Sequence, residues 1–341
     1  FVTSFMSVEK VVNNAVYAQV PQSPTDGVPM VPDNPDAEGE GGGSDSFDIP
    51  ADAYGAAILA LVRDVPLLSD EGRRKIAAYH CLFGFGLLII NLAVQFALLY
   101  FVNLLVVRKD ILRVQRIYGD LSRNVFDGDG VFQRDAWDDY SQRNKEIVCG
   151  LGMTNRIFYN CCIFCWTLTV LIEFRITVNF LSDVNKMPDC SSDTEQIVED
   201  ADKNRVVALT RRSKIVIWII VIFPKVTICA CLLWLGCNWL SATKGFEALV
   251  MNSVSMSFVV GTDETLFQAL LPQSLKEEVE GLDFFVKKND RFSAERDIFY
   301  RYNRSLVYFF CACVFVYFYP SYMQTVMPTK IFQMEEACGN F

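Results

Sequence analysis

Four long apolar stretches limit this chain to very few architectures. They lie at about residues 79–107, 157–181, 215–240 and 306–326. Each exceeds the roughly 20 residues that a helix needs to cross about 30 Å of hydrocarbon. Trp and Tyr residues near their ends suit the two interfaces of a membrane. The sequence therefore predicts an all-α polytopic membrane protein, with four transmembrane helices and amphipathic or interfacial helices on the inner face.

Two shorter regions precede the membrane domain, which is predicted to cover residues 79–341. Residues 1–50 form an acidic flexible tail, and the part from 21 to 50 is so rich in Pro, Gly, Asp and Ser that it cannot fold alone. Residues 51–78 are predicted to hold an amphipathic helix and the lead-in to the first span. The net charge of −9 argues against nucleic acid, which requires a basic face. The expected partners are the lipid bilayer and other membrane protein subunits.

Three ionisable residues lie well inside the predicted spans. Glu173 and Arg175 are in the second span, and Lys225 is in the third. A charge at membrane depth costs roughly 2.5–3.5 kcal/mol unless it is paired or hydrated. Residue counts from the span ends place Glu173 and Lys225 at similar depths. We therefore predict an ion pair between them in the outer half of the membrane, with the guanidinium of Arg175 extended toward the surface.

The predicted pair has two interpretations. It can be a structural clamp that fixes the register of two helices. It can also be a gate or an ion-coordinating site, because intramembrane charges are functional candidates by default. Pro224 matters in both interpretations, since it removes a backbone hydrogen bond and can kink the helix directly before Lys225.

Basic residues set the expected orientation. Lys and Arg are most numerous between the first two spans and between the last two, and the positive-inside rule assigns these loops to the cytosolic face. Both termini then lie on the non-cytosolic side, extracellular or lumenal. The segment 246–271 is too polar for a fifth span and too apolar for a loop, so it is predicted to be interfacial or re-entrant.

Thiol and imidazole groups favour neither a metal site nor catalysis. Cys162 and Cys165 have CxxC spacing, but cysteine at lipid depth is usually a small packing residue, so no metal is predicted. His80 is the single histidine, which makes a Ser-His-Asp arrangement improbable, and at the end of a span it is expected to be solvated. Cys190 and Cys338 are both predicted outside, where an oxidising compartment would let them form a disulfide.

Motifs of the common enzyme classes do not occur in the sequence. It has no phosphate-binding glycine loop, zinc-hydrolase motif or nucleophile elbow, so neither a cofactor nor an enzymatic activity is predicted. Gly84-Phe85-Gly86 lies within an apolar span and is better explained as a close helix contact than as part of a dinucleotide site.

One segment carries a resemblance to other proteins. Residues 239–254 read WLSATKGFEALVMNSV, and residues 263–272 read DETLFQALLP. This run resembles a segment that follows a span in uncharacterised multi-span membrane proteins of dinoflagellates and related algae, with similar Phe-Glu-x-Leu, Asn-x-Val, Asp-Glu and Ala-Leu-x-Pro elements. The resemblance implies an algal membrane protein with a shared membrane fold, and it brings no activity with it.

The function expected from the sequence is that of a non-catalytic subunit in a larger membrane assembly, with a structural or accessory role. Asn91, Gln95 and Asn103 on the first span could hydrogen-bond a neighbouring helix, and the acidic tail could wrap a partner. One alternative is an ion channel or transporter component that uses Glu173 and Lys225. Another is a pigment-associated subunit of an algal photosystem.

Overall fold

Helices make up most of the described part of the chain. The computed structural model describes residues 44–151, 155–190, 197–200, 203–243, 246–287, 291–326 and 329–338. All of them belong to one unit that begins at Gly42. The predicted acidic tail, residues 1–50, lies outside the described residues except for its last seven positions.

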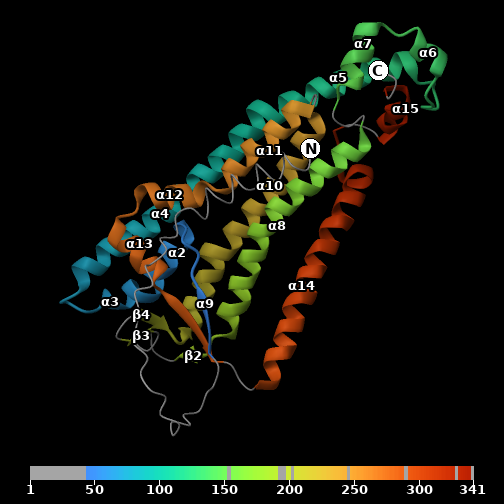
Figure 1. Ribbon diagram of the computed structural model, residues 1–341. Helices are drawn as coiled ribbons and strands as arrows, with labels where there is room; N and C mark the ends of the chain where they lie inside the picture. Colours follow the sequence, from blue (N-terminus) through green and yellow to red (C-terminus); the bar gives the residue numbers. More distant parts are fainter. Residues whose placement is uncertain are drawn as a thin grey trace, which may run out of the picture. The chain divides into compact units, whose positions relative to one another are not determined.

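Four helices are long and apolar enough to cross a membrane, which confirms the predicted number. The first is α4 (Arg74–Phe101), continued by the π-helical turn η2 (Val102–Val107) and α5 (Arg108–Val125). The second is α8 (Arg156–Lys186), and the third consists of α9 (Arg211–Ile217), the π-helical turn η5 (Trp218–Ile222) and α10 (Phe223–Ala242). The fourth is α14 (Arg291–Phe318), continued by the π-helical turn η6 (Tyr319–Met323) (Figure 1). Side chains such as Ile89, Ile172 and Phe310 are exposed on these helices, as expected of surfaces that contact lipid.

Shorter elements connect the long helices. The helical ones are α2 (Ala53–Leu59), the π-helical turn η1 (Ala60–Asp64), α3 (Val65–Leu67), α6 (Arg134–Asp138), α7 (Gln142–Cys149), α11 (Phe246–Val260), α12 (Thr262–Leu270), α13 (Gln273–Glu280), the 3-10 helix η7 (Thr329–Met334) and α15 (Glu335–Cys338). Side-chain caps begin several helices: Asn155 accepts a hydrogen bond from the Phe158 amide at α8, and Thr210 accepts one from the Ser213 amide at α9.

Two small sheets lie at one end of the helices, which we call the sheet end. Four strands pair in the order β1 (Ser44–Asp48), β6 (Asp283–Lys287), β4 (Lys203–Val206) and β3 (Ile197–Asp200), and β2 (Asp189–Cys190) pairs with β5 (Leu209–Thr210). β1 and β6 are antiparallel, with Phe47 opposite Phe284, and the two rings stack 5.1 Å apart. Phe284 is fully buried in a cluster with Phe180 and Leu271, so the sheet closes this end of the apolar core.

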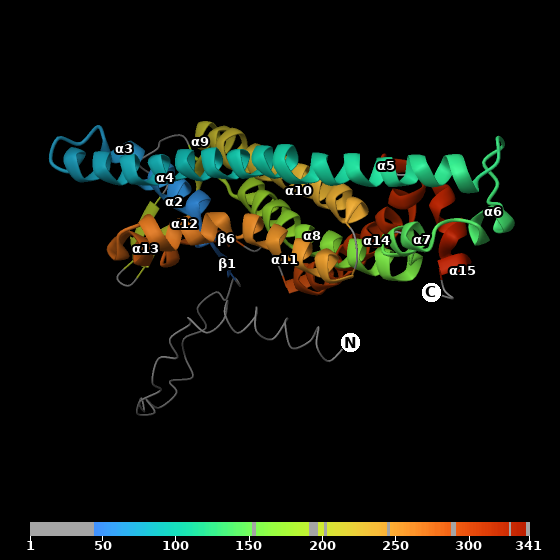
Figure 2. The same cartoon turned by 90° about the horizontal axis from the view of Figure 1, so that it is seen from above.

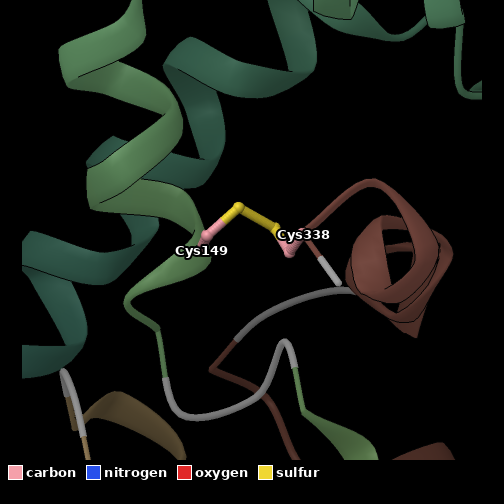
Figure 3. Close-up of a disulfide and its surroundings, with 2 residues drawn as sticks. All are labelled: Cys149 and Cys338. Carbon is pink, nitrogen blue, oxygen red and sulfur yellow. A yellow bond between two sulfur atoms is a disulfide. The ribbon is translucent and has the colours of Figure 1, made fainter. Parts of the chain in front are cut away.

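A disulfide between Cys149 and Cys338 marks the opposite end, which we call the disulfide end (Figure 3). Cys149 is the last residue of α7, between the first two long helices, and Cys338 is the last residue of α15. The predicted partner of Cys338 was Cys190, and the structure corrects this. Cys190 lies in β2, at the sheet end. The prediction failed because it placed the C-terminal segment and the segment after α5 on different faces.

The segment 246–271 explains that failure. α11 packs against α10 and α8, and α12 packs against α4 and α2. After α10 the chain turns back, and α11 and α12 run toward the sheet end, where Leu271 belongs to the core (Figure 2). The segment is not a hairpin, because its two helices follow one another along the bundle. This additional passage reverses the direction of α14 from the one that four spans would require.

The segment from β1 to α3 also enters the bundle from the sheet end. β1 lies at the sheet end, and α2 packs against α4 with its N-terminus directed toward the middle of the bundle. Every residue of α2 is buried, so the helix predicted within residues 51–78 is not amphipathic. Its close approach to α4 requires glycine: a Cβ at Gly84 would lie 2.8 Å from the carbonyl oxygen of Ala56. A Cβ at Gly86 would meet nothing within 4 Å, so only the first of the two glycines makes the expected contact.

Candidate functional site

Lys225 is the centre of a buried ionic cluster. Its side chain lies in α10, three residues after the end of the π-helical turn η5, and the residue is only 9% exposed. The ammonium nitrogen lies 2.8 Å from Oδ2 of Asp52, 3.6 Å from Oδ2 of Asp263 and 3.9 Å from Oε2 of Glu173. We call Lys225 and these three carboxylates the Lys225 centre. Its members come from four separate segments of the chain.

Asp52 holds the closest position because it caps the buried helix α2. One of its carboxylate oxygens accepts hydrogen bonds from the backbone amides of Tyr54 and Gly55, at 3.0 and 2.8 Å. The other accepts from Lys225 at 2.8 Å. A carboxylate is favoured at a helix N-terminus, where unpaired amides carry partial positive charge. The local sequence therefore places Asp52 at the start of α2, and the packing of α2 into the bundle brings it to Lys225.

Asp263 and Glu173 complete the cluster from two other helices. Asp263 lies in the first turn of α12, directly after the break at Gly261 that separates α12 from α11, and it is 5% exposed. Glu173 projects from the middle of α8, as the eighteenth of its 31 residues. Its side chain is 26% exposed, so it is the most accessible of the three carboxylates.

Charge in the Lys225 centre does not balance. One ammonium faces three carboxylates, so full ionisation would leave two negative charges in excess. Burial makes an uncompensated charge costly, and such a site lowers its free energy by binding a proton or a cation. Lys225 is the fifteenth residue of the 32-residue helix Arg211–Ala242, so the imbalance lies near the middle of a candidate span.

A polar chain extends from the cluster along α4. The ring of Tyr54 lies 5.0 Å from the ammonium nitrogen of Lys225, within the range of a cation–π contact. The Tyr54 hydroxyl donates to Oε1 of Gln95 at 3.3 Å, and Asn91 donates to the same oxygen at 3.4 Å. Asn91 is fully buried, and its Oδ1 atom has no hydrogen-bond partner. Asn91 and Gln95 therefore form hydrogen bonds within this chain, whereas Asn103 is exposed.

Of the site residues predicted from the sequence, Glu173, Lys225 and Pro224 lie in or next to the Lys225 centre, whereas Arg175 does not. Glu173 and Lys225 meet at 3.9 Å, but the shortest contact of Lys225 is with Asp52. Pro224 lies in the first turn of α10, where a π-helical turn interrupts the long helix. Arg175 is exposed beside Ile172 and Ile176, on the outer surface of α8 and away from the Lys225 centre.

Sequence reasoning missed Asp52 and Asp263 as members of the site. Both were recognisable as residues at helix starts, where a carboxylate has an ordinary capping role. Only for Asp263 did the sequence indicate a position deep in the bundle, because this residue follows an apolar run long enough to reach the middle of a bundle. No local pattern places Asp52 at that depth.

The comparisons with known proteins add no identity to this site. The chain matches no family model, and no curated protein or solved structure is similar to it. Any functional assignment therefore depends on the chemistry of the residues themselves.

Proposed function

We propose that this protein moves protons or small cations across a membrane, as a channel or transporter component, and that the Lys225 centre is the binding site. The observation that carries the proposal is the buried excess of carboxylates over ammonium groups near the middle of the candidate spans. A purely structural clamp needs one carboxylate for one ammonium, whereas an ion-binding site needs carboxylates in excess. The proposal assigns no enzymatic activity to the chain.

The backbone around the centre supports the same proposal. The re-entrant helix α2 and the interrupted helix α12 both begin beside Lys225, and the π-helical turn η5 ends two residues before Pro224. Ion sites in membrane transporters are commonly built from such discontinuous helices, and π-helical turns are frequent at functional sites. Three irregularities within one small region fit a site that rearranges when its ligand binds.

Ion flux through purified protein tests the proposal. We expect liposomes that contain the wild-type protein to dissipate an imposed proton or alkali-cation gradient, as followed with a trapped fluorescent indicator. Asp263→Asn should lower this flux roughly ten- to a hundredfold, because it removes a charged partner worth about 1.5–3 kcal/mol. Glu247→Gln is the control, since it also removes a carboxylate from the first turn of a helix, but at an exposed position in α11, and its flux should equal that of the wild type.

Two results would count against the proposal. One is wild-type protein that is monodisperse and folded but moves neither protons nor alkali cations. The other is flux that stays the same in Asp263→Asn. Size-exclusion profiles and thermal unfolding of each variant separate a loss of transport from a loss of folding.

A second candidate, the accessory subunit expected from the sequence, is supported by Arg175. Its guanidinium lies on an exposed apolar face of α8, where lipid solvates it poorly and an acidic residue of another subunit could pair with it. Arg175→Gln separates the two candidates. Protein that conducts alone, with unchanged flux in this variant, favours transport. Protein that does not conduct, and whose larger complex the variant disperses, favours assembly.

The orientation that we propose places the disulfide end on the non-cytosolic side. It reverses the orientation expected from the sequence, which assigned the loop between the first two spans to the cytosolic face. Disulfides persist in oxidising compartments, so Cys149 and Cys338 belong outside the cytosol. Basic residues agree with this: among the described residues, the sheet end has four Lys and Arg in 63–75, six in 186–214 and six in 276–304, whereas the disulfide end has nine in 108–156 and Lys330. The cytosolic face is then the sheet end, with its sixteen basic residues against ten.

The oxidation state of Cys149 in the native membrane checks this orientation. Protein that is alkylated before extraction should migrate differently with and without reductant, and Cys149→Ser and Cys338→Ser should each abolish the difference. Cys190→Ser should leave it unchanged. Recovery of both thiols in the alkylated, reduced form would contradict the proposed orientation.

A further inference from the structure

A second ionic cluster lies at the other end of the helical segment that Asp52 begins. Asp64 is the last residue of η1 and is 2% exposed. Arg63 binds it through Nε at 3.0 Å and also binds Glu278 of α13 at 2.8 Å. Nη2 of Arg63 lies 2.8 Å from Nδ1 of His80, which is on α4. The chain's single histidine is thus not merely solvated, as the sequence suggested, but joins three segments at the sheet end.

The contact between Arg63 and His80 depends on the protonation of Nδ1. A guanidinium has only donors, so this hydrogen bond forms only when Nδ1 of His80 carries no proton. The same Nδ1 atom lies 3.4 Å from Oδ1 of Asp64. It can hydrogen-bond to that carboxylate only when it carries a proton. The two contacts exclude each other, and the proton on His80 selects between them.

The charges around His80 do not balance. Arg63 contributes one positive charge, and Asp64 and Glu278 contribute two negative charges, so a neutral His80 leaves one negative charge in excess. Burial lowers the pKa of Arg63, but the hydrogen bonds and charges of Asp64 and Glu278 more than offset it, so that the net shift is upward and Arg63 stays charged. Cys81, next to His80, donates to the carbonyl oxygen of Ala60. These are the charged and titratable groups recorded around His80 in the described part of the chain.

Exposure makes His80 reachable. Its side chain is 28% exposed, and histidine ordinarily changes charge between about pH 5 and pH 8. A proton from solution that binds Nδ1 breaks the hydrogen bond from Arg63 and forms one to Asp64. Protonated His80 and Arg63 are then two neighbouring cations that repel each other, so the guanidinium must move and its own hydrogen bonds to Asp64 weaken.

We propose that His80 is a proton-binding site through which pH at the sheet end controls the helical segment 53–64 and, through its cap Asp52, the Lys225 centre. The inference rests on the proposed function for its second half, since the effect on ion movement requires that the Lys225 centre moves ions. The first half, a proton-dependent contact between the end of this helical segment and α4, depends only on the contacts among Arg63, Asp64 and His80.

Hydrogen exchange and NMR of the full chain in detergent test the first half without any measurement of flux. The single histidine gives one imidazole signal, which reports directly whether the ring binds a proton between pH 5 and pH 8. Backbone amides of 58–64, corrected for intrinsic exchange, should exchange roughly tenfold faster at pH 5.5 than at pH 8, because Arg63 loses hydrogen bonds to two partners, His80 and Asp64, whereas His80 gains one. In His80→Gln this pH dependence should vanish. Glu277→Gln, next to Glu278 but bonded to Gln273 instead, should retain it.

Outcomes of the two experiments separate the two proposals. An imidazole signal that does not titrate in this range, or an exchange profile with the same pH dependence in His80→Gln, overturns the inference. A His80-dependent exchange profile in protein without ion flux supports the proton-dependent contact and rejects transport. Flux whose pH dependence is unchanged in His80→Gln rejects the control of the Lys225 centre by His80, even if the protein conducts.

Discussion

Lys225→Met should destabilise this protein more than any other conservative substitution in the bundle. The change leaves Asp52, Asp263 and Glu173 without the ammonium that lies between them. Removal of one partner from a buried ion pair costs about 3–5 kcal/mol, because the remaining charge is buried and unpaired. We expect a large drop in the temperature of thermal unfolding in detergent and a low yield of monodisperse protein.

Lys186→Met provides the matched control for this prediction. Lys186 pairs with Asp183 at the end of α8, and its side chain is 60% exposed. Such surface pairs contribute about 0–1 kcal/mol, so this variant should unfold close to the wild type. Lys225→Met combined with Asp52→Asn should recover part of the loss, since it removes one of the unpaired carboxylates. Equal unfolding temperatures for Lys225→Met and Lys186→Met would show that Lys225 is not the centre of a stabilising cluster.

Gly84→Ala should have the second largest effect, because it forces α2 away from α4. The added Cβ would lie 2.8 Å from the carbonyl oxygen of Ala56 and 2.9 Å from the Cβ of Ala60. Neither neighbour is the flexible end of a side chain, so the helix itself must move. Overpacking of this kind costs about 1–3 kcal/mol. We expect a lower unfolding temperature and, since Asp52 moves with α2, a change in ion flux as well.

Gly86→Ala is the natural comparison, two residues further along the same helix. Its Cβ would meet nothing within 4 Å, and alanine is favoured over glycine in a helix by about 0.8–1 kcal/mol. The two variants should therefore shift the unfolding temperature in opposite directions. Shifts of the same sign and size would mean that α2 does not pack against Gly84 as described.

Some parts of this fold can be predicted from the sequence and others cannot. The long helices follow from local composition, since a run of apolar residues long enough for hydrocarbon is visible in any single segment. The passage of 246–271 does not, because its Ser, Thr, Asp and Glu residues lower its hydropathy, and the sequence does not show that neighbouring helices bury Thr262 and Asp263. Asp263 illustrates the point: alone it argues against a span, and beside Lys225 it is part of a site. The error in the disulfide followed from this one missed passage.

The amino-acid sequence by itself determined the number of long apolar helices, the presence of charges inside them and the glycine and proline positions where they can approach or bend. These properties depend on residues close together in the chain. Only the tertiary structure decided which groups meet: Asp52 with Lys225 across 173 residues, Cys149 with Cys338 across 189, and Arg63 with Glu278 across 215. Contacts of this range depend on the direction in which each segment crosses the bundle, and that direction changes with every additional passage.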